Sequence, residues 1–154
     1  MKMKTNVQAP DHQQHLLVTR EFDLPVVLLF KAYTDPEIFS RWMNTRVVKF
    51  DMQPHGSYCF ETSDPSGNVA FRANGTIHEV IQDERITRTF EMENTPFPVQ
   101  LEYLEFEKLG ENTSKLTMHI VYKSVAHRDQ MLKLPFAQGL NLAHNRLQEA
   151  MAIR

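Results

Sequence analysis

An arginine within a stretch of alternating residues is the first candidate for binding chemistry in this sequence. Arg88 shares its phase with Ile86 and Phe90 in a predicted strand, and the apolar pair indicates that this face points inward. A guanidinium on an inward face can bind the carboxylate or phenolate of a ligand through charge-assisted hydrogen bonds. Two alternatives stay open: an internal ion pair, or a side chain that reaches out past the edge of the sheet.

Histidine is the other residue type that could carry acid–base chemistry near neutral pH. His144 follows Leu140 by four residues in a predicted helix, so it could edge a cavity as a general acid or base, with ordinary packing as the alternative. His12 and His15 have a spacing that suits a metal, but no third ligand is near them. The other histidines are dispersed, and we expect no metal and no cofactor.

The sequence offers little for nucleophilic catalysis. The single cysteine, Cys59, is out of phase with Tyr58 and Phe60, so we expect it to face away from any cavity as an ordinary sheet residue. The chain has no Gly-x-Ser-x-Gly motif, and its five glycines form no phosphate-binding loop. Catalytic residues therefore stay unassigned.

Two helix-start signals and one terminal stripe identify the helices that must position these residues. Asp23 with Pro25, and Asp35 with Pro36, each combine a capping residue with a proline suited to a first helical turn. They predict two short helices near the start of the chain. Apolar residues at helical spacing over residues 136–151 predict a long amphipathic helix at its end.

Between these helices the apolar period changes from 3.6 to 2, which is typical of strands. Short turns separate the strands, so the sheet is expected to be antiparallel. With the opening strand, about seven strands are predicted, over residues 16–22, 47–51, 57–62, 69–81, 85–92, 99–108 and 115–122.

The predicted fold is α+β, with a curved antiparallel sheet wrapped around the long C-terminal helix and two short helices after the first strand. The terminal helix is the natural cover for one face of such a sheet. A bent sheet that grips one helix leaves room between the two, so we expect a cavity for a ligand there. The side chains expected to line it are Trp42, Tyr58, Phe60, Phe71, Arg88, Phe90, Tyr103, Met118, Phe136, Leu140 and His144.

Length and charge bound the domain organisation and the partners. The 154 residues suffice for one core, so we expect a single domain over residues 16–154 behind a flexible N-terminal arm, residues 1–15. Lys and Arg total 17 against 19 Asp and Glu, which argues against nucleic-acid binding. The start of the chain lacks an apolar signal region, and no run is long enough to span a membrane. With one cysteine and hence no intrachain disulfide, these features favour the cytoplasm.

Several motifs resemble the SRPBCC (START-like, helix-grip) superfamily, and within it the branch named for homologues of the activator of heat-shock protein 90 ATPase. The resemblance covers about residues 16–151. It is carried by the opening Val18–Pro25, by Phe30–Glu37 with Arg41-Trp42, and by Gly56–Phe60, Gly75–Val80, Asp83–Ile86, Leu116–Met118, Gly139–Asn141 and Arg146-Leu147. The sequence departs from the family pattern at two places. Trp42 is followed by Met43-Asn44-Thr45, where the family often has a second tryptophan and Gly-Pro. The paired glycines that the family usually has before the aromatic strand are Gly56-Ser57 here.

The resemblance implies a fold with an internal cavity for a small apolar molecule, and it transfers no catalytic set. Our first hypothesis is therefore the binding of a small hydrophobic or aromatic ligand. The alternatives are a cyclase, dehydratase or hydrolase that uses the same cavity, and a chaperone-related protein-interaction module. A polar pair in the cavity favours an enzyme, whereas a large exposed apolar patch favours a protein partner. The oligomeric state stays open, with a homodimer as one alternative.

Overall fold

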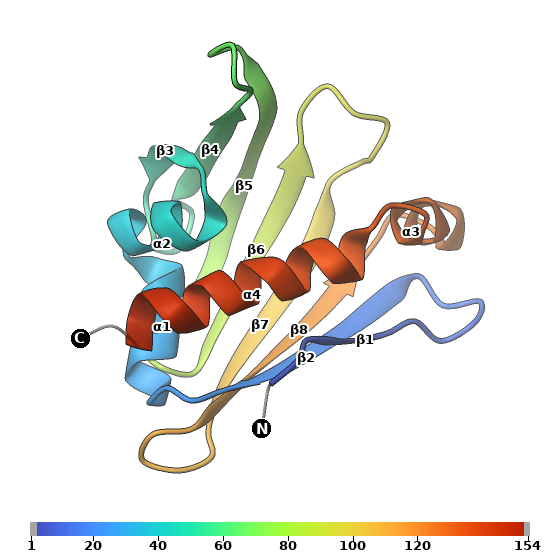
Figure 1. Ribbon diagram of the computed structural model, residues 1–154. Helices are drawn as coiled ribbons and strands as arrows, with labels where there is room; N and C mark the ends of the chain where they lie inside the picture. The colour runs from blue at the N-terminus through green and yellow to red at the C-terminus, as the bar shows by residue number, and fades with distance from the viewer. Residues whose placement is uncertain (1–2, 153–154) are drawn as a thin grey trace.

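The computed structural model describes residues 3–152, which form one curved antiparallel sheet and four helices (Figure 1). The sheet order is β1-β2-β8-β7-β6-β5-β4-β3. The strands are β1 (Asn6–Gln8), β2 (His15–Phe22), β3 (Arg46–Phe50), β4 (Ser57–Ser63), β5 (Val69–Ile81), β6 (Arg85–Met92), β7 (Gln100–Lys108) and β8 (Ser114–Val121). The helices are α1 (Val26–Thr34), α2 (Pro36–Met43), α3 (Val125–Leu132) and α4 (Phe136–Ala152).

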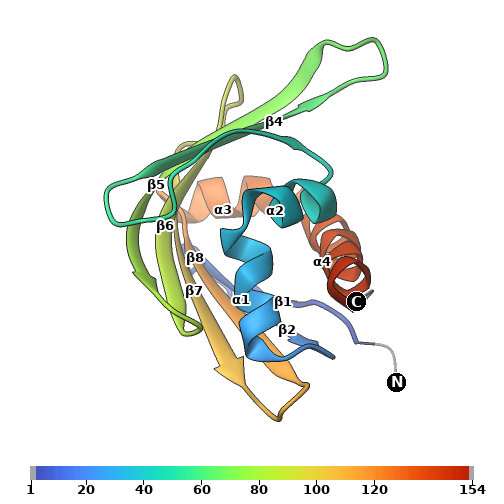
Figure 2. The ribbon, with the colours of Figure 1, turned by 90° about the vertical axis from the view of Figure 1, so that its left-hand side faces the viewer.

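The sheet curves around the helices, as Figure 2 shows, and α4 runs across its concave side. Helix α4 packs against α1, α2 and α3, and its Leu147 side chain is fully buried. The expected α+β fold, a curved antiparallel sheet with a long C-terminal helix, is confirmed. Among the described helices, none is long and apolar enough to cross a membrane.

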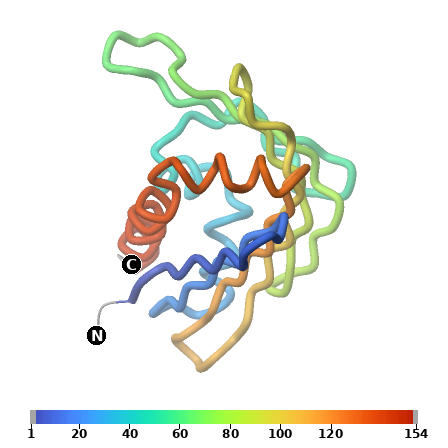
Figure 3. The backbone as a smooth tube through the Cα atoms, turned by 90° about the vertical axis from the view of Figure 1, so that its right-hand side faces the viewer, coloured from blue at the N-terminus to red at the C-terminus, as the bar shows by residue number. Residues whose placement is uncertain are grey.

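An eighth strand, β1, lies within the segment expected to be a flexible arm. Its three residues pair antiparallel with β2, so that Val7 lies opposite Val18 (Figure 3). Just before it, the backbone N–H of Thr5 donates to the Asn141 side-chain oxygen on α4 at 2.9 Å. The expectation of a loose arm is therefore wrong for residues 5–8, because contacts distant in sequence hold them. Residues 1 and 2 of that arm lie outside the described part of the chain.

The start of α2 follows from its local sequence. The Asp35 carboxylate accepts hydrogen bonds from the backbone N–H groups of Glu37 and Ile38 at 3.0 and 3.1 Å, and Pro36 occupies the first helical position. These contacts satisfy N–H groups that have no partner within the helix. Helix α1 differs: Pro25 precedes it, and no side chain caps its first turn. Asp23 therefore does not have the capping role expected for it.

The sheet bends where β5 carries a glycine. A Cβ atom on Gly75 would lie 2.0 Å from the backbone oxygen of Thr89 and 2.7 Å from the Tyr58 ring, so only glycine fits. The Tyr58 hydroxyl donates to the same Thr89 oxygen at 2.5 Å. Further along β5, its register against β6 shifts between Ile77 and Glu79. These features place the bend beside Tyr58, at the point where the strands turn around the helices.

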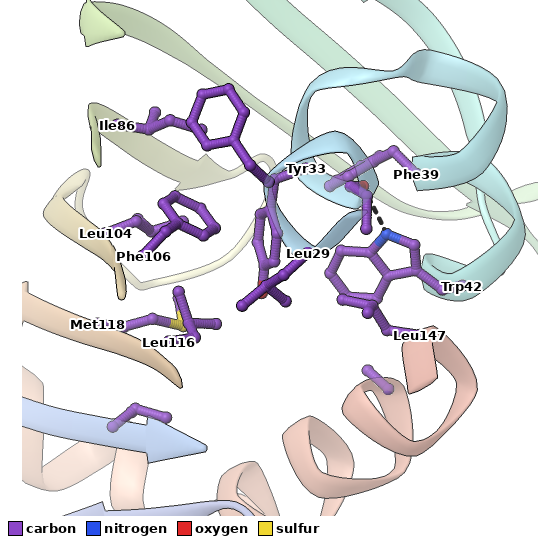
Figure 4. Packing of buried hydrophobic residues seen from close by; sticks show 14 of the residues in the cluster. Leu29, Tyr33, Phe39, Trp42, Ile86, Leu104, Phe106, Leu116, Met118 and Leu147 are labelled. Atoms are coloured by element: carbon purple, nitrogen blue, oxygen red, sulfur yellow. Dashed lines mark hydrogen bonds between the residues drawn. The ribbon is translucent and has the colours of Figure 1, made fainter. Parts of the chain in front are cut away.

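An aromatic group from α1 and α2 forms the centre of the core (Figure 4). The Tyr33 and Trp42 ring centroids are 5.0 Å apart, and those of Phe39 and Trp42 are 5.3 Å apart. The Trp42 indole N–H donates to the backbone oxygen of Ala32 at 2.8 Å, which fixes the ring next to Leu147 of α4. This group joins the two short helices to the terminal helix.

Candidate functional site

A cavity of about 380 Å³ lies between the concave face of the sheet and α4. Its walls come from α1, α2, β4–β8, α3 and α4. They are mainly apolar and aromatic, and the lining residues are Tyr33, Phe39, Trp42, Met43, Phe60, Phe71, Arg88, Phe90, Met92, Gln100, Glu102, Met118, Ile120, Met131, Pro135, Phe136, Gly139, Leu140, Ala143 and Arg146. Among them are most of the residues predicted to line a cavity: Trp42, Phe60, Phe71, Arg88, Phe90, Met118, Phe136 and Leu140.

Three of the predicted lining residues lie elsewhere. Tyr58 is buried behind the wall, next to Gly75, and His144 belongs to a separate polar cluster described below. The prediction for Tyr103 is wrong: its side chain is 41% exposed and lies beside His119 on the outer face of the sheet. The physical reason is the phase of β7, whose inward side chains are Gln100, Glu102, Leu104 and Phe106.

The polar part of the cavity is an ion pair between neighbouring strands. Arg88 on β6 lies opposite Glu102 on β7, and its Nε–H donates to the Glu102 Oε1 atom at 2.9 Å. The second oxygen, Oε2, accepts from the Gln100 side-chain amide at 2.8 Å. Both members of the ion pair are buried, with side-chain exposures of 9% and 5%.

This pair decides between the interpretations of Arg88 that the sequence left open. The Glu102 carboxylate already balances the guanidinium charge, so the internal ion pair, the alternative left open by the sequence, is the arrangement found. Burial lowers the pKa of Arg88, but the charge and the hydrogen bond of the Glu102 carboxylate oppose this, and the pKa is raised overall. Arg88 therefore stays charged, and its charge is matched within the protein.

Two tyrosines complete the surroundings of the pair. The Arg88 guanidinium carbon lies 5.9 Å from the Tyr33 ring centroid and 5.5 Å from the Tyr58 ring centroid, within the range of cation–π contacts. Burial raises the pKa of both tyrosine hydroxyls above their usual range, so both stay neutral. Tyr122, the residue directly after β8, carries a buried hydroxyl with no hydrogen-bond partner among residues 3–152.

Sequence reasoning missed Glu102, Gln100 and Tyr33 as site residues. The signal for the first two was their common phase with Leu104 and Phe106. That signal competed with Leu101 and Tyr103, which form an apolar pair in the opposite phase and favoured the wrong face.

His144 belongs to a buried polar cluster that joins the residue before β1 to α1, β2 and α4. Its Nδ1 atom lies 2.7 Å from the Thr5 hydroxyl, and its Nε2 atom lies 3.4 Å from the Tyr33 hydroxyl. Arg20 donates to the Asn141 side-chain oxygen at 3.2 Å and to that of Asn145 at 3.0 Å. The polar side-chain atoms of this cluster thus find their hydrogen-bond partners within the protein. These contacts make His144 a packing residue, which is the alternative that the sequence left open.

Burial, and secondly the charge of Arg20, lower the pKa of His144 to about 3. An unfolded chain binds a proton at this histidine near pH 6.5, whereas the folded chain does not, so stability falls as the pH drops below about 6.5. Between pH 7 and pH 5 this group alone should remove roughly 2 kcal/mol. Urea unfolding of the wild type and His144→Gln at both pH values measures the difference. His78→Gln, at an exposed position, is the control and should keep the wild-type pH dependence. Equal pH dependence in wild type and His144→Gln contradicts the prediction.

The other sequence candidates lie apart from the cavity. Cys59 is a free thiol in β4, partly exposed and outside the cavity lining. His15 packs edge-on against His119, with ring centroids 4.9 Å apart, and His12 is exposed. Within residues 3–152, no three His, Cys, Asp or Glu side chains lie close enough together to hold a metal ion.

A protein-family model described as "Activator of Hsp90 ATPase homolog 1-like protein" matches residues 23–152. This chain belongs to that family. The match runs from just before α1 to the last residue of α4, so it includes both the helices and the strands that line the cavity. The resemblance drawn from the sequence motifs is thus confirmed. No curated protein matches the sequence.

Solved structures share the fold of this family member over nearly the whole chain. A protein from Rhodobacter sphaeroides is 16% identical with a TM-score of 0.86, covering 99% of this chain and 100% of that chain. A protein from Mycobacterium smegmatis is 21% identical with a TM-score of 0.81, covering 97% and 99%. A protein from Nitrosomonas europaea is 23% identical with a TM-score of 0.76, covering 93% and 97%. At these identities the similarity establishes the fold alone.

Proposed function

We propose that this protein binds one small apolar or aromatic molecule in the cavity between the sheet and α4. The observation that carries the proposal is the cavity itself, about 380 Å³ in volume with mainly apolar and aromatic walls. Ligand pockets in proteins are roughly 300–1,000 Å³ and combine apolar walls with a few polar groups. The cavity has both properties, because Arg88, Glu102 and Gln100 are grouped on one part of an otherwise apolar surface.

The geometry favours binding over catalysis even though a polar pair faces the cavity. Glu102 is paired with Arg88 and bonded to Gln100, and the described lining residues include no histidine or second carboxylate that could form an acid–base pair with it. A general base needs an oxygen within reach of the substrate proton. His144, the other acid–base candidate, bonds to Thr5 and Tyr33 and does not line the cavity. The cyclase, dehydratase or hydrolase alternative therefore has less support.

The protein-interaction alternative also has less support. The exposed large apolar side chains are spread over α1, β3, β5, β7, α3, α4 and the connecting loops: Val27, Val48, Val69, Val99, Tyr103, Leu109, Leu132, Leu134 and Leu142. Single exposed apolar residues are ordinary on protein surfaces, whereas partner sites gather them into one patch.

A titration with N-phenyl-1-naphthylamine tests the proposal, because this neutral dye fluoresces more strongly in an apolar site than in water. We expect saturable binding by the wild type. Gly139→Phe should weaken it by about ten-fold or more, since Gly139 lines the cavity and a side chain there meets open space. At a dye concentration about 100 times the Kd, the wild type should gain about 2.7 kcal/mol of stability.

Ala137→Phe is the matched control, because Ala137 lies two residues earlier on α4, is exposed and does not line the cavity. It should bind the dye like the wild type. A dye signal that does not saturate, or equal losses in Gly139→Phe and Ala137→Phe, would contradict binding in this cavity. Thermal unfolding of each variant without dye shows that the fold is intact.

A further inference from the structure

We infer that the ligand is an electrically neutral molecule with an aromatic or alicyclic body and a carbonyl oxygen, and that this oxygen accepts hydrogen bonds from the Nη atoms of Arg88. The inference rests on the proposed function and adds the chemical class of the ligand. It differs from the anionic ligand that the sequence had offered as one interpretation of Arg88. Three observations carry it: the donors that Arg88 leaves without a partner, the charge balance around them, and the shape of the cavity walls.

Arg88 has hydrogen-bond donors that the protein does not use. A guanidinium presents five N–H groups. The ion pair with Glu102 is made by Nε–H, and within residues 3–152 neither Nη atom has a hydrogen-bond partner. Arg88 lines the cavity, so these donors are left for whatever occupies it. An apolar ligand that displaced water from these donors would leave them unpaired, which costs binding free energy, so a ligand with an acceptor atom at this position is favoured.

The charge balance selects a neutral acceptor over a carboxylate. Arg88 and Glu102 already form a one-to-one pair at 2.9 Å. A ligand carboxylate at the Nη atoms would add a second negative charge beside Glu102 in a buried setting, which like-charge repulsion and desolvation both oppose. The remaining charged lining residue, Arg146, is exposed and donates its Nε–H to the Trp42 backbone oxygen at 2.8 Å. Its guanidinium is thus on an exposed residue of α4, whereas Arg88 is buried on β6.

The polar atoms also select an acceptor over a donor. Both Glu102 oxygens already accept hydrogen bonds, from Arg88 and from the Gln100 amide. Each Glu102 oxygen thus has a bond within the protein, whereas the two Arg88 Nη atoms have none among residues 3–152, so the donors are the groups that most need a partner from the ligand. A ligand carbonyl fits them, whereas a ligand amine or ammonium would face donors. The rest of the ligand must be apolar, because the walls around the pair include Tyr33, Met118 and Ile120.

Three naphthalene probes of nearly the same shape test the inference. They are 2-acetylnaphthalene, its alkene isostere 2-isopropenylnaphthalene, and 2-naphthoate. Dissociation constants come from displacement of N-phenyl-1-naphthylamine. A hydrogen bond to a charged donor is expected to make the ketone bind the wild type roughly ten-fold or more tightly than the alkene. The naphthoate should bind more weakly than the ketone.

The double variant Arg88→Met/Glu102→Met removes both charges together and should bind ketone and alkene with equal affinity. The matched control, Arg85→Met/Glu79→Met, removes an exposed ion pair at 2.9 Å between β6 and β5 and should keep the ten-fold preference. The wild-type ratio of ketone to alkene does not depend on the folding of any variant.

Each outcome decides the inference. Equal binding of ketone and alkene by the wild type overturns it while leaving the proposed function intact. Tightest binding of the naphthoate overturns it in favour of anion recognition. A ketone preference that survives in Arg88→Met/Glu102→Met also overturns it, because another group would then be the donor. If the dye binds in the cavity and none of the three probes displaces it, the inference fails, whereas failure of the dye itself to bind overturns the proposed function.

Discussion

Glu102→Met is expected to lower the free energy of unfolding by about 3–5 kcal/mol. The substitution leaves the Arg88 guanidinium buried in a mainly apolar cavity without its carboxylate, which lies 2.9 Å away in the wild type. An unpaired buried charge loses its hydration without an equivalent interaction in return. Urea unfolding at neutral pH, followed by circular dichroism, measures the change.

The companion variants separate the cost of an unpaired charge from the cost of a changed core. Arg88→Met/Glu102→Met should recover most of the lost stability, because apolar residues of similar size often replace a buried ion pair without loss. Glu79→Met breaks an exposed pair with Arg85 and should change stability by less than about 1 kcal/mol. If Glu102→Met lowers the free energy of unfolding by no more than Glu79→Met does, the prediction that the buried Arg88–Glu102 pair stabilises the fold is wrong.

Leu147→Ala is expected to cost about 2–5 kcal/mol. Leu147 is 0% exposed, and Figure 4 shows its side chain on the side of α4 that faces Trp42. The truncation removes buried apolar surface and leaves a space that the rigid ring of Trp42 cannot fill, since its indole N–H is bonded to Ala32. The same urea experiment measures it.

Leu142→Ala is the control for this prediction. Leu142 lies on the same helix but is 49% exposed, so its truncation should change stability by less than about 1 kcal/mol. Equal effects of the two substitutions would mean that α4 does not pack on the core through Leu147.

Local signals in the sequence were sufficient for α1, α2, α4 and most strands. The Asp35-Pro36 pair determines where α2 begins, because the cap and the proline act within one turn. The apolar stripe of α4 and the alternation of the middle strands likewise depend on neighbours a few residues away. Most of the residues that line the cavity could therefore be predicted, because the position of a residue within a helix or strand determines whether its side chain faces inward.

Long-range contacts explain what the sequence did not reveal. Strand β1 has only three residues, and the contact of Thr5 with Asn141 spans 136 positions in sequence. The phase of β7 was ambiguous because both of its faces carry apolar residues, so Tyr103 was assigned inward in place of Glu102. The partner of Arg88 depends on the register of β6 against β7, which no local pattern specifies.

The central claim is that the cavity between the sheet and α4 binds one neutral, carbonyl-bearing apolar molecule. A crystal structure of the wild type soaked with 2-acetylnaphthalene tests it most directly. We predict electron density for the probe inside the cavity, with its rings against Trp42 and Phe136 and its oxygen about 2.7–3.2 Å from an Arg88 Nη atom. A probe bound elsewhere on the molecule, or a cavity left empty at a saturating probe concentration, would contradict the account.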